Sequence, residues 1–393
     1  TVESVNWTGS EENRNSRLCN MDTISFIQNK INEHILTNIM QDYFVVEDAD
    51  SVYIAKKSLN TRVEDFDPYF DDEEKQDQRP TKIPTILKFF NRPQDVSLKF
   101  DNKPVWYPKK VSDTRMGTYK IKWTEENPVN IWKKLQERPT FDDLKFVPHR
   151  WGSNDGGLKA RRIYNTFDGW GCDPLYDENG DPMVERCRLI RKHLHNILCA
   201  HDTATYDWVI QWLATKVQKP RMKIGTAIGI TGGQGCGKGT FIKGVMGRIF
   251  NVNHYLHTME MNQIVGRFTN TENALFTFLD EALFVHDKQT TDKLKAIVTE
   301  TSLHVERKYK DAKNVQSMND YWFATNNVLA APLENDDRRY CVLSVKPMEL
   351  NPEEKRKYFD ALWHEITNGG AEAFFGYLLN IELDPNINVR TSP

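Results

Sequence analysis

The spacing of apolar residues predicts a different kind of structure in each half of the chain. In the first half, isoleucines recur at helical spacing and predict an amphipathic helix over residues 22–40; they are Ile24, Ile27, Ile31, Ile35 and Ile39. The segments YFVVE and SVYIA that follow predict two short strands. RCRLIRKHLHNILC and YDWVIQWLATKVQ place their apolar residues on one helical face each and predict two further helices.

From residue 224 onward, the pattern changes to unbroken apolar runs separated by glycine-rich, helical and polar segments. IGTAIGI, ALFTFL and YWFAT lack polar alternation, which is typical of strands buried on both faces of a parallel sheet. We therefore expect an α/β domain with a parallel central sheet at residues 221–393. Three segments precede it: a linker or tail (1–20), a small α+β accessory domain (21–125) and a connecting, collar-like helical region (126–220).

Composition adds limits on partners and compartment. The chain has 393 residues, which is too long for one core. Its formal net charge of -3 means that any basic surface must be local. No apolar stretch approaches the roughly 18 residues of a membrane span, and the six cysteines are scattered, which favours reduced thiols in the cytoplasm. Because the chain begins without a methionine, we expect it to be a fragment of a longer protein.

TGGQGCGKGTF, residues 231–241, directly follows the apolar run IGTAIGI. A glycine, four further residues and then Gly-Lys is the spacing of a phosphate-binding loop, whose backbone N–H groups surround an anion at the start of a helix. Lys238 is expected to reach the β- and γ-phosphates. We expect ATP to be bound here by Gly232, Gly233, Gly235, Cys236, Gly237, Lys238, Gly239 and Thr240.

Gly239 departs from this pattern, because a Ser or Thr that binds Mg²⁺ normally follows the loop lysine. Two arrangements are open: Thr240 shifts to become a metal ligand, or Asp280 and the phosphates hold Mg²⁺ through water. Both keep nucleotide binding, since the loop amides and Lys238 supply most of the attraction for phosphate. The rate of hydrolysis stays open.

Polar residues at the ends of the later strands complete a possible hydrolytic site. ALFTFLDEALF ends its apolar run in Asp280, which can hold Mg²⁺ through water, and Glu281, which can activate the attacking water. Asn326 follows the next run and can hydrogen-bond the γ-phosphate and that water. Arg338 and Arg339 precede a further strand and can enter a neighbouring subunit's site as the phosphate leaves.

LHVERKYKDAKNVQ predicts a hairpin with two short strands and a strongly basic tip. Such a tip can bind the phosphates of single-stranded DNA, although a solvated charged hairpin explains the segment equally well. The basic candidates are Arg307, Lys308, Lys310 and Lys313. Residues 103–123 also mix lysines with aromatic residues, but a β-rich surface with buried aromatics explains that stretch better.

Taken in order, the phosphate loop, the Asp-Glu pair, the basic hairpin, the asparagine and the arginines resemble superfamily 3 helicases. The likeness is narrower to the helicase-like C-terminal region of phage and plasmid primase–polymerases. The segments that carry it, within residues 125–380, are GGQGCGKGTF, GRFTN, FLDEALF, LKAIVTETSLHVERKYKDAKNVQ, FATNN and NDDRRYCVLSV. The resemblance implies an AAA+-like P-loop NTPase domain that assembles into a ring, usually a hexamer. It also implies that Lys308 or Lys310 contacts DNA in the central channel and that Arg338 or Arg339 acts across subunits.

The function implied is an ATP-dependent DNA helicase or translocase module for phage or plasmid replication in the cytoplasm of a bacterial host. A primase–polymerase domain is then expected on the same full-length chain. Two alternatives remain open. One is a nucleotide-binding DNA clamp or oligomerisation module with weak or no ATPase activity. The other is a nucleoside-monophosphate kinase, because adenylate kinases also carry GKGT.

Overall fold

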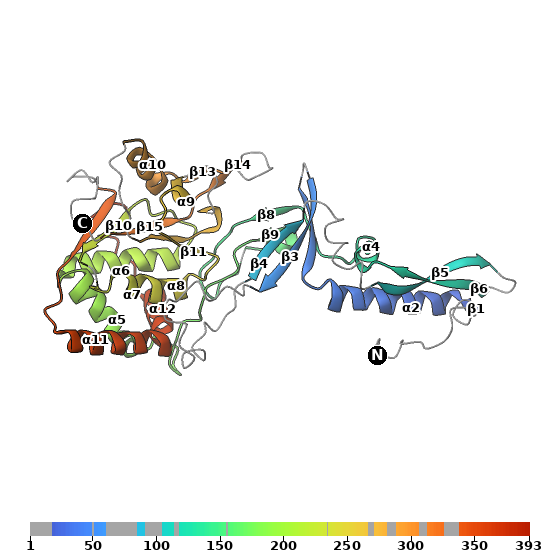
Figure 1. Cartoon of the computed structure of the whole chain (residues 1–393), viewed down its shortest axis with the longest axis horizontal. Coiled ribbons are helices and arrows are strands. Elements are labelled where there is room, and N and C mark those ends of the chain that lie inside the picture. Colours follow the sequence, from blue (N-terminus) through green and yellow to red (C-terminus); the bar gives the residue numbers. More distant parts are fainter. Residues whose placement is uncertain are drawn as a thin grey trace. The chain divides into compact units, whose positions relative to one another are not determined.

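The computed structural model of the protein describes residues 18–48, 51–59, 85–90, 104–113, 118–154, 156–233, 235–265, 271–280, 288–305, 313–325 and 338–393 (Figure 1). Contacts divide the chain into two compact units. The first comprises Thr1–Ser58, Ile86–Leu144 and Leu158–Tyr164, and the second comprises Leu59–Thr85, Lys145–Gly157 and Asn165–Pro393. The predicted domain boundaries at residues 20, 125 and 220 are not tested by this division and stay predictions.

The first unit contains the predicted isoleucine helix and both predicted strands. The helix is observed as α2 (Met21–His34), which continues into the π-helical turn η2 (Ile35–Ile39), and Ile24 and Ile35 are buried. The two strands pair antiparallel in a sheet of order β4-β3-β2-β7. Its members are β2 (Tyr43–Asp48), β3 (Ser51–Leu59), β4 (Thr85–Phe90) and β7 (Thr140–Phe141).

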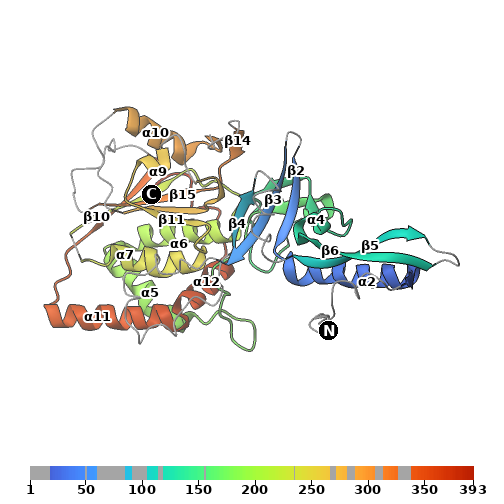
Figure 2. The ribbon, with the colours of Figure 1, turned by 45° about the vertical axis from the view of Figure 1, so that its right-hand side comes forward.

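The lysine- and aromatic-rich stretch of the first unit forms an antiparallel ladder that packs on α2 (Figures 1 and 2). Gln28 donates a hydrogen bond from Nε2 to the Pro108 carbonyl at 2.9 Å, and Tyr107 packs against the unit's buried core. The remaining elements are β1 (Leu18–Asn20), β5 (Val105–Asp113), β6 (Thr118–Glu126), α4 (Pro128–Trp132), β8 (Asp143–Lys145), η6 (Lys159–Arg161) and β9 (Ile163–Asn165).

The second unit is built on a parallel sheet of five strands in the order β11-β12-β15-β10-β16. Its strands are β10 (Ala227–Gly232), β11 (Tyr255–Thr258), β12 (Phe276–Leu279), β15 (Asp320–Thr325) and β16 (Tyr340–Val345). Every residue of β12 and β15 is buried, as the unbroken apolar runs require. The predicted parallel sheet and the mixed α/β class are therefore confirmed.

Alternate residues of the strands enter two different cores, because successive side chains point to opposite faces of a sheet. Tyr321 and Phe323 pack with residues of α9 and α10, whereas Trp322 and Ala324 pack with residues of the helices on the other face. Both views show the two helical layers (Figures 1 and 2). The first layer contains α9 (Asn262–Val265), α10 (Lys288–Thr299) and the hairpin β13 (Ser302–Val305) and β14 (Lys313–Gln316).

The helices predicted upstream of the sheet belong to its second helical layer and share its core. They are α5 (Arg188–Lys192) with η8 (His193–Leu198), and α6 (Thr203–Gln218). The other members are η7 (Val184–Cys187), α7 (Lys238–Phe241), η9 (Ile242–Met246), α8 (Gly247–Ile249), α11 (Pro352–Glu365), η11 (Ile366–Gly370) and α12 (Ala371–Asn380). The short turn η10 (Thr271–Asn273) precedes β12.

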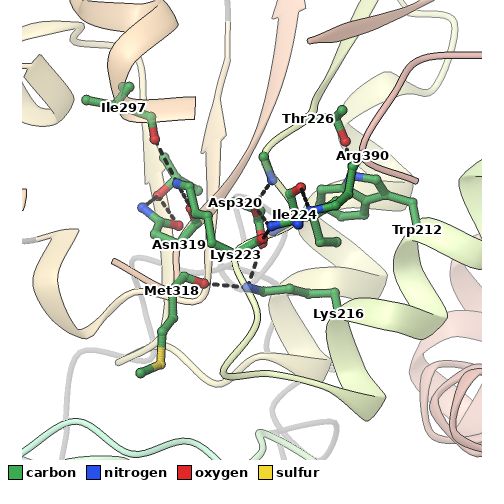
Figure 3. Close-up of polar contacts among 12 residues, drawn as sticks. Trp212, Lys216, Lys223, Ile224, Thr226, Ile297, Met318, Asn319, Asp320 and Arg390 are labelled. Carbon is green, nitrogen blue, oxygen red and sulfur yellow. Dashed lines mark hydrogen bonds and ion pairs between the residues drawn. The ribbon is translucent and has the colours of Figure 1, made fainter. Parts of the chain in front are cut away.

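A buried network of polar groups ties α6 to the start of β15 (Figure 3). The Lys216 ammonium lies 2.7 Å from Asp320 Oδ2 and donates to the Met318 carbonyl, and both side chains are almost fully buried. Asp320 also accepts the Ile224 N–H at 3.1 Å, while Lys223 donates to the Ile297 carbonyl at 2.7 Å. Burial lowers the pKa of Lys216, and the neighbouring Asp320 carboxylate partly offsets this.

Two sequence-based limits can be compared with the described part of the chain. None of its helices combines the length and the apolar character needed to cross a membrane. Its buried cysteines are free thiols, namely Cys172, Cys187, Cys199, Cys236 and Cys341.

Candidate functional site

The carboxyl ends of β10, β12 and β15 meet at one edge of the sheet. In the parallel register, Thr231 lies opposite Thr325, and Leu279 lies opposite Phe323. The glycine loop leaves β10 at this edge, and Asp280 is the first residue after β12. The sheet therefore brings together two of the segments that the sequence singles out. Ligands of open α/β sheets bind at this edge.

The glycines of the loop have the conformations and clearances that a tight turn requires. Gly235 and Gly237 adopt left-handed φ values of 71° and 87°, which other residues rarely take. A Cβ atom at Gly232 would lie 2.8 Å from the Val345 carbonyl oxygen. Gly237 then begins the helical segment 238–249, formed by α7, η9 and α8. The first amides of such a segment have no acceptors within the helix and face the loop.

Lys238 is folded back onto the loop that carries it. Its ammonium donates to the Gly232 carbonyl and, at 3.2 Å, to the Gly233 carbonyl, and its side chain is buried. A phosphate bound in this loop would compete with these carbonyl oxygens for the lysine N–H groups. The loop is curled and its lysine lies within it, while phosphate binding by this loop stays a prediction.

His193 packs against the backbone of the glycine loop at Gly237. A Cβ atom at Gly237 would lie 2.5 Å from His193 Cε1, so the imidazole touches the loop backbone. His193 Nε2 donates to the Gly237 carbonyl at 3.2 Å, and Nδ1 accepts from the Tyr358 hydroxyl at 2.8 Å. Burial lowers the pKa of His193 to about 4, so the ring is neutral. The sequence carries no signal that would single out His193 for this contact, since it is one of several histidines near a predicted helix.

Helix α11 adds a second residue that the sequence did not single out. A Cβ atom at Gly235 would lie 3.3 Å from the Nζ atom of Lys355. The loop therefore has an ammonium beside it from a helix more than a hundred residues downstream. The only sequence signal was a basic residue in an amphipathic helix, which usually indicates a solvated face.

Asp280 is ionised and paired. Its Oδ2 atom lies 2.7 Å from Lys243 Nζ and 3.6 Å from His257 Nε2. Burial raises the pKa of Asp280, but hydrogen bonds to His257 and Lys243 and the charge of Lys243 outweigh burial and bring the pKa to about 2. The carboxylate is therefore negative at every physiological pH.

The described residues fit a directly bound Mg²⁺ poorly. Gly239 has no oxygen in its side chain. The predicted ligands are Thr240 and Asp280, and Asp280 is paired with Lys243. Within the described ranges, no group of three or more His, Cys, Asp or Glu side chains could hold a metal ion. Mg²⁺ stays a prediction from the sequence.

Several predicted site residues lie outside the described residues: Glu281, Asn326, Arg307, Lys308 and Lys310. The two arms of the predicted basic hairpin are observed as β13 and β14, which pair antiparallel with Val305 opposite Lys313. Lys313 is thus the first residue of β14, at the end of the ladder nearest the tip.

Arg338 and Arg339 lie at the opposite end of the sheet from the glycine loop. They directly precede β16, and the Arg339 carbonyl accepts the N–H of Ala227, the first residue of β10. The loop begins at the other end of β10, about 16 Å away at roughly 3.3 Å per strand residue. These arginines are therefore not brought to the loop of their own chain.

The second unit has a five-stranded parallel sheet, helices on both of its faces and a glycine loop after an interior strand. This arrangement fits an α/β NTPase-like fold. Two solved structures share the fold; both are apo structures of the C-terminal region of NrS-1. They are 19% and 16% identical to this chain, with TM-scores of 0.56 and 0.54, and each comparison covers 92% of this chain and 71% of the other. DUF5906, a family of unknown function, matches residues 230–339. No curated protein matches the chain at a significant level.

Proposed function

We propose that this chain is an ATP-dependent DNA helicase or translocase module that acts in phage or plasmid replication. The observation that carries the proposal is the meeting of the glycine loop and Asp280 at the carboxyl edge of the parallel sheet. These two segments are about forty residues apart in the sequence. Their convergence supports a site for the phosphates of ATP.

In this proposal, each group of the chain has a separate role at the site. Loop amides and the start of the helical segment 238–249 bind phosphate oxygens, and Lys238 neutralises their charge. Glu281 orients and deprotonates the attacking water, and Asn326 hydrogen-bonds the γ-phosphate. Arg338 or Arg339 stabilises the leaving phosphate of an adjacent subunit, which agrees with their distance from their own loop.

Oligomerisation and DNA binding follow from the same proposal. A site that needs an arginine from the next copy forms only in an assembly, and a closed ring, usually a hexamer, satisfies every site. The basic tip between β13 and β14 then holds single-stranded DNA through Arg307, Lys308, Lys310 and Lys313. A primase–polymerase domain on the full-length chain would receive the unwound strand.

A nucleotide-binding clamp without turnover is the second candidate. The pairing of Asp280 with Lys243 and the missing hydroxyl at Gly239 favour it, because both weaken the usual arrangement for hydrolysis.

ATP hydrolysis measured with and without single-stranded DNA separates the candidates. A translocase hydrolyses ATP faster when DNA is added, whereas a clamp binds DNA with no DNA-stimulated turnover. Production of ADP from ATP and AMP, unaffected by DNA, would instead indicate a nucleoside-monophosphate kinase. A translocation assay on a forked duplex completes the test.

A further inference from the structure

Lys243 lies in the second turn of the helical segment that follows the glycine loop. Helical side chains tilt toward the N-terminus, so residue 243 reaches back over residue 239. The Cε, Cδ and Nζ atoms of Lys243 lie 3.7, 3.8 and 3.9 Å from the position that a Cβ atom of Gly239 would take. The lysine therefore occupies the space beside the residue that usually carries the metal-binding hydroxyl.

The same ammonium reaches across to the acidic side of the site. Lys243 Nζ lies 2.7 Å from Asp280 Oδ2, and the two side chains are 30% and 19% exposed. An ammonium has three N–H donors, and one carboxylate oxygen uses only one of them. The partly exposed group can therefore bind Asp280 and a phosphate oxygen at the same time.

In a phosphate-loop NTPase, Mg²⁺ lies between the hydroxyl after the loop lysine and the acidic residue at the next strand end. Here glycine replaces the hydroxyl, and the acidic residue is paired with a cation that belongs to the chain itself. A divalent ion entering this space would lie beside an ammonium of the same sign. The charge that neutralises the phosphates is thus already present.

We propose that Lys243 is a resident cation of the phosphate site, so that nucleoside triphosphate binds this chain without Mg²⁺. Lys243 and Lys238 contact the terminal phosphates from two sides, and Lys355 lies beside the loop at Gly235. The ligand is the metal-free triphosphate. This inference rests on the proposed nucleotide site and concerns binding, not the rate of hydrolysis.

Equilibrium binding of a non-hydrolysable ATP analogue tests the inference. The dissociation constant is measured by calorimetry in EDTA and in MgCl₂ for the unchanged chain, for Lys243→Met and for Lys243→Arg. We expect the unchanged chain to bind within about threefold in the two buffers. Lys243→Met should bind about tenfold more weakly in EDTA, the effect of one charge-assisted hydrogen bond, and should recover affinity in MgCl₂.

Lys243→Arg separates a charge effect from a packing effect, since it keeps the cation and should keep binding in EDTA. Lys357→Met, which removes an exposed lysine of α11 paired with Glu353, is the matched control and should change neither constant. Thermal melts report whether each variant folds. Should Lys243→Met fail to fold, Lys243→Arg and the unchanged chain still decide the outcome.

Two results would overturn the inference. Binding by the unchanged chain that depends on MgCl₂ by a hundredfold or more overturns it but leaves the proposed nucleotide site intact. An absence of binding in both buffers overturns the proposed function and the inference with it.

Discussion

In the proposed nucleotide site, Lys238 is the side chain expected to contribute most to phosphate binding. We expect Lys238→Ala to weaken ATP binding about a hundredfold or more, because it removes the charged donor nearest the loop while the glycine turn remains. The fold should be unchanged, as monitored by thermal melting, and calorimetry measures the affinity. Lys357→Ala is the control. An unaltered dissociation constant would refute the assignment of the loop as a phosphate site.

Two buried histidines make stability depend on pH. Burial lowers the pKa of both His193 and His254 to about 4, below the ordinary value of 6.5. Because the unfolded chain binds these protons first, the free energy of unfolding is highest above pH 6.5 and decreases as pH falls toward 4. Urea titrations at pH 7.5 and pH 5 should differ by about 2 kcal/mol per histidine.

Replacing one buried histidine tests this pH dependence. His254→Gln should remove about half of the difference between the two titrations, even if it lowers stability at both pH values. His364→Gln, at an exposed position of α11, should leave the difference unchanged. A stability that is flat between pH 7.5 and pH 5 would contradict the buried, neutral state of both rings.

At the scale of helices and strands, much of the second unit could be predicted, because a strand that is buried on both faces has an unbroken run of apolar residues. The runs that contain Phe276–Leu279 and Asp320–Thr325 have almost no polar alternation, and both are interior strands. The contacts of Lys243 with Asp280 and of His193 with Gly237 could not be predicted. They join segments whose spacing depends on how helices pack, which single-sequence periodicity does not contain.

The proposed function assigns DNA binding to the basic tip between β13 and β14, separately from the nucleotide site. Replacing Lys308 and Lys310 together by Ala should weaken binding of single-stranded DNA and reduce the slope of log affinity against log salt by about 1.4, or 0.7 for each lost phosphate contact. Fluorescence anisotropy over a range of salt concentrations measures both. Replacing the exposed Lys30 and Lys357 together is the control. Equal slopes in all three proteins would show that the DNA contact lies elsewhere.

Lys216 of α6 and Asp320 of β15 form a buried ion pair that links the two elements. Removing the charge of either residue leaves the other charge buried without its partner. We expect Lys216→Met or Asp320→Asn alone to lower the free energy of unfolding by about 3–5 kcal/mol. The double variant removes both charges and should cost less than either single change. Denaturant titrations complete this double-mutant cycle. Additive losses would mean that the two groups do not interact.

At the scale of the whole molecule, the separation of Arg338 and Arg339 from their own loop predicts complementation between inactive subunits. A double Arg338→Ala, Arg339→Ala variant and a Glu281→Gln variant should each hydrolyse ATP very slowly. Their mixture should regain ATPase activity, because some interfaces then combine an intact loop and base with an intact arginine. Mixing Glu281→Gln with Lys238→Ala is the control and should regain none. If no ratio of the first two variants restores turnover, the arginines do not act between subunits.

The contact between Lys216 and Asp320 also decides where the polypeptide can be shortened. A fragment beginning at residue 221 would retain the five strands and the glycine loop but lose α5 and α6, and Asp320 would lose the Lys216 ammonium that pairs with it. A fragment that begins ahead of Arg188 keeps α5 and α6 in place. A minimal fragment of the glycine-loop domain should therefore include these upstream helices, because their residues form part of its core.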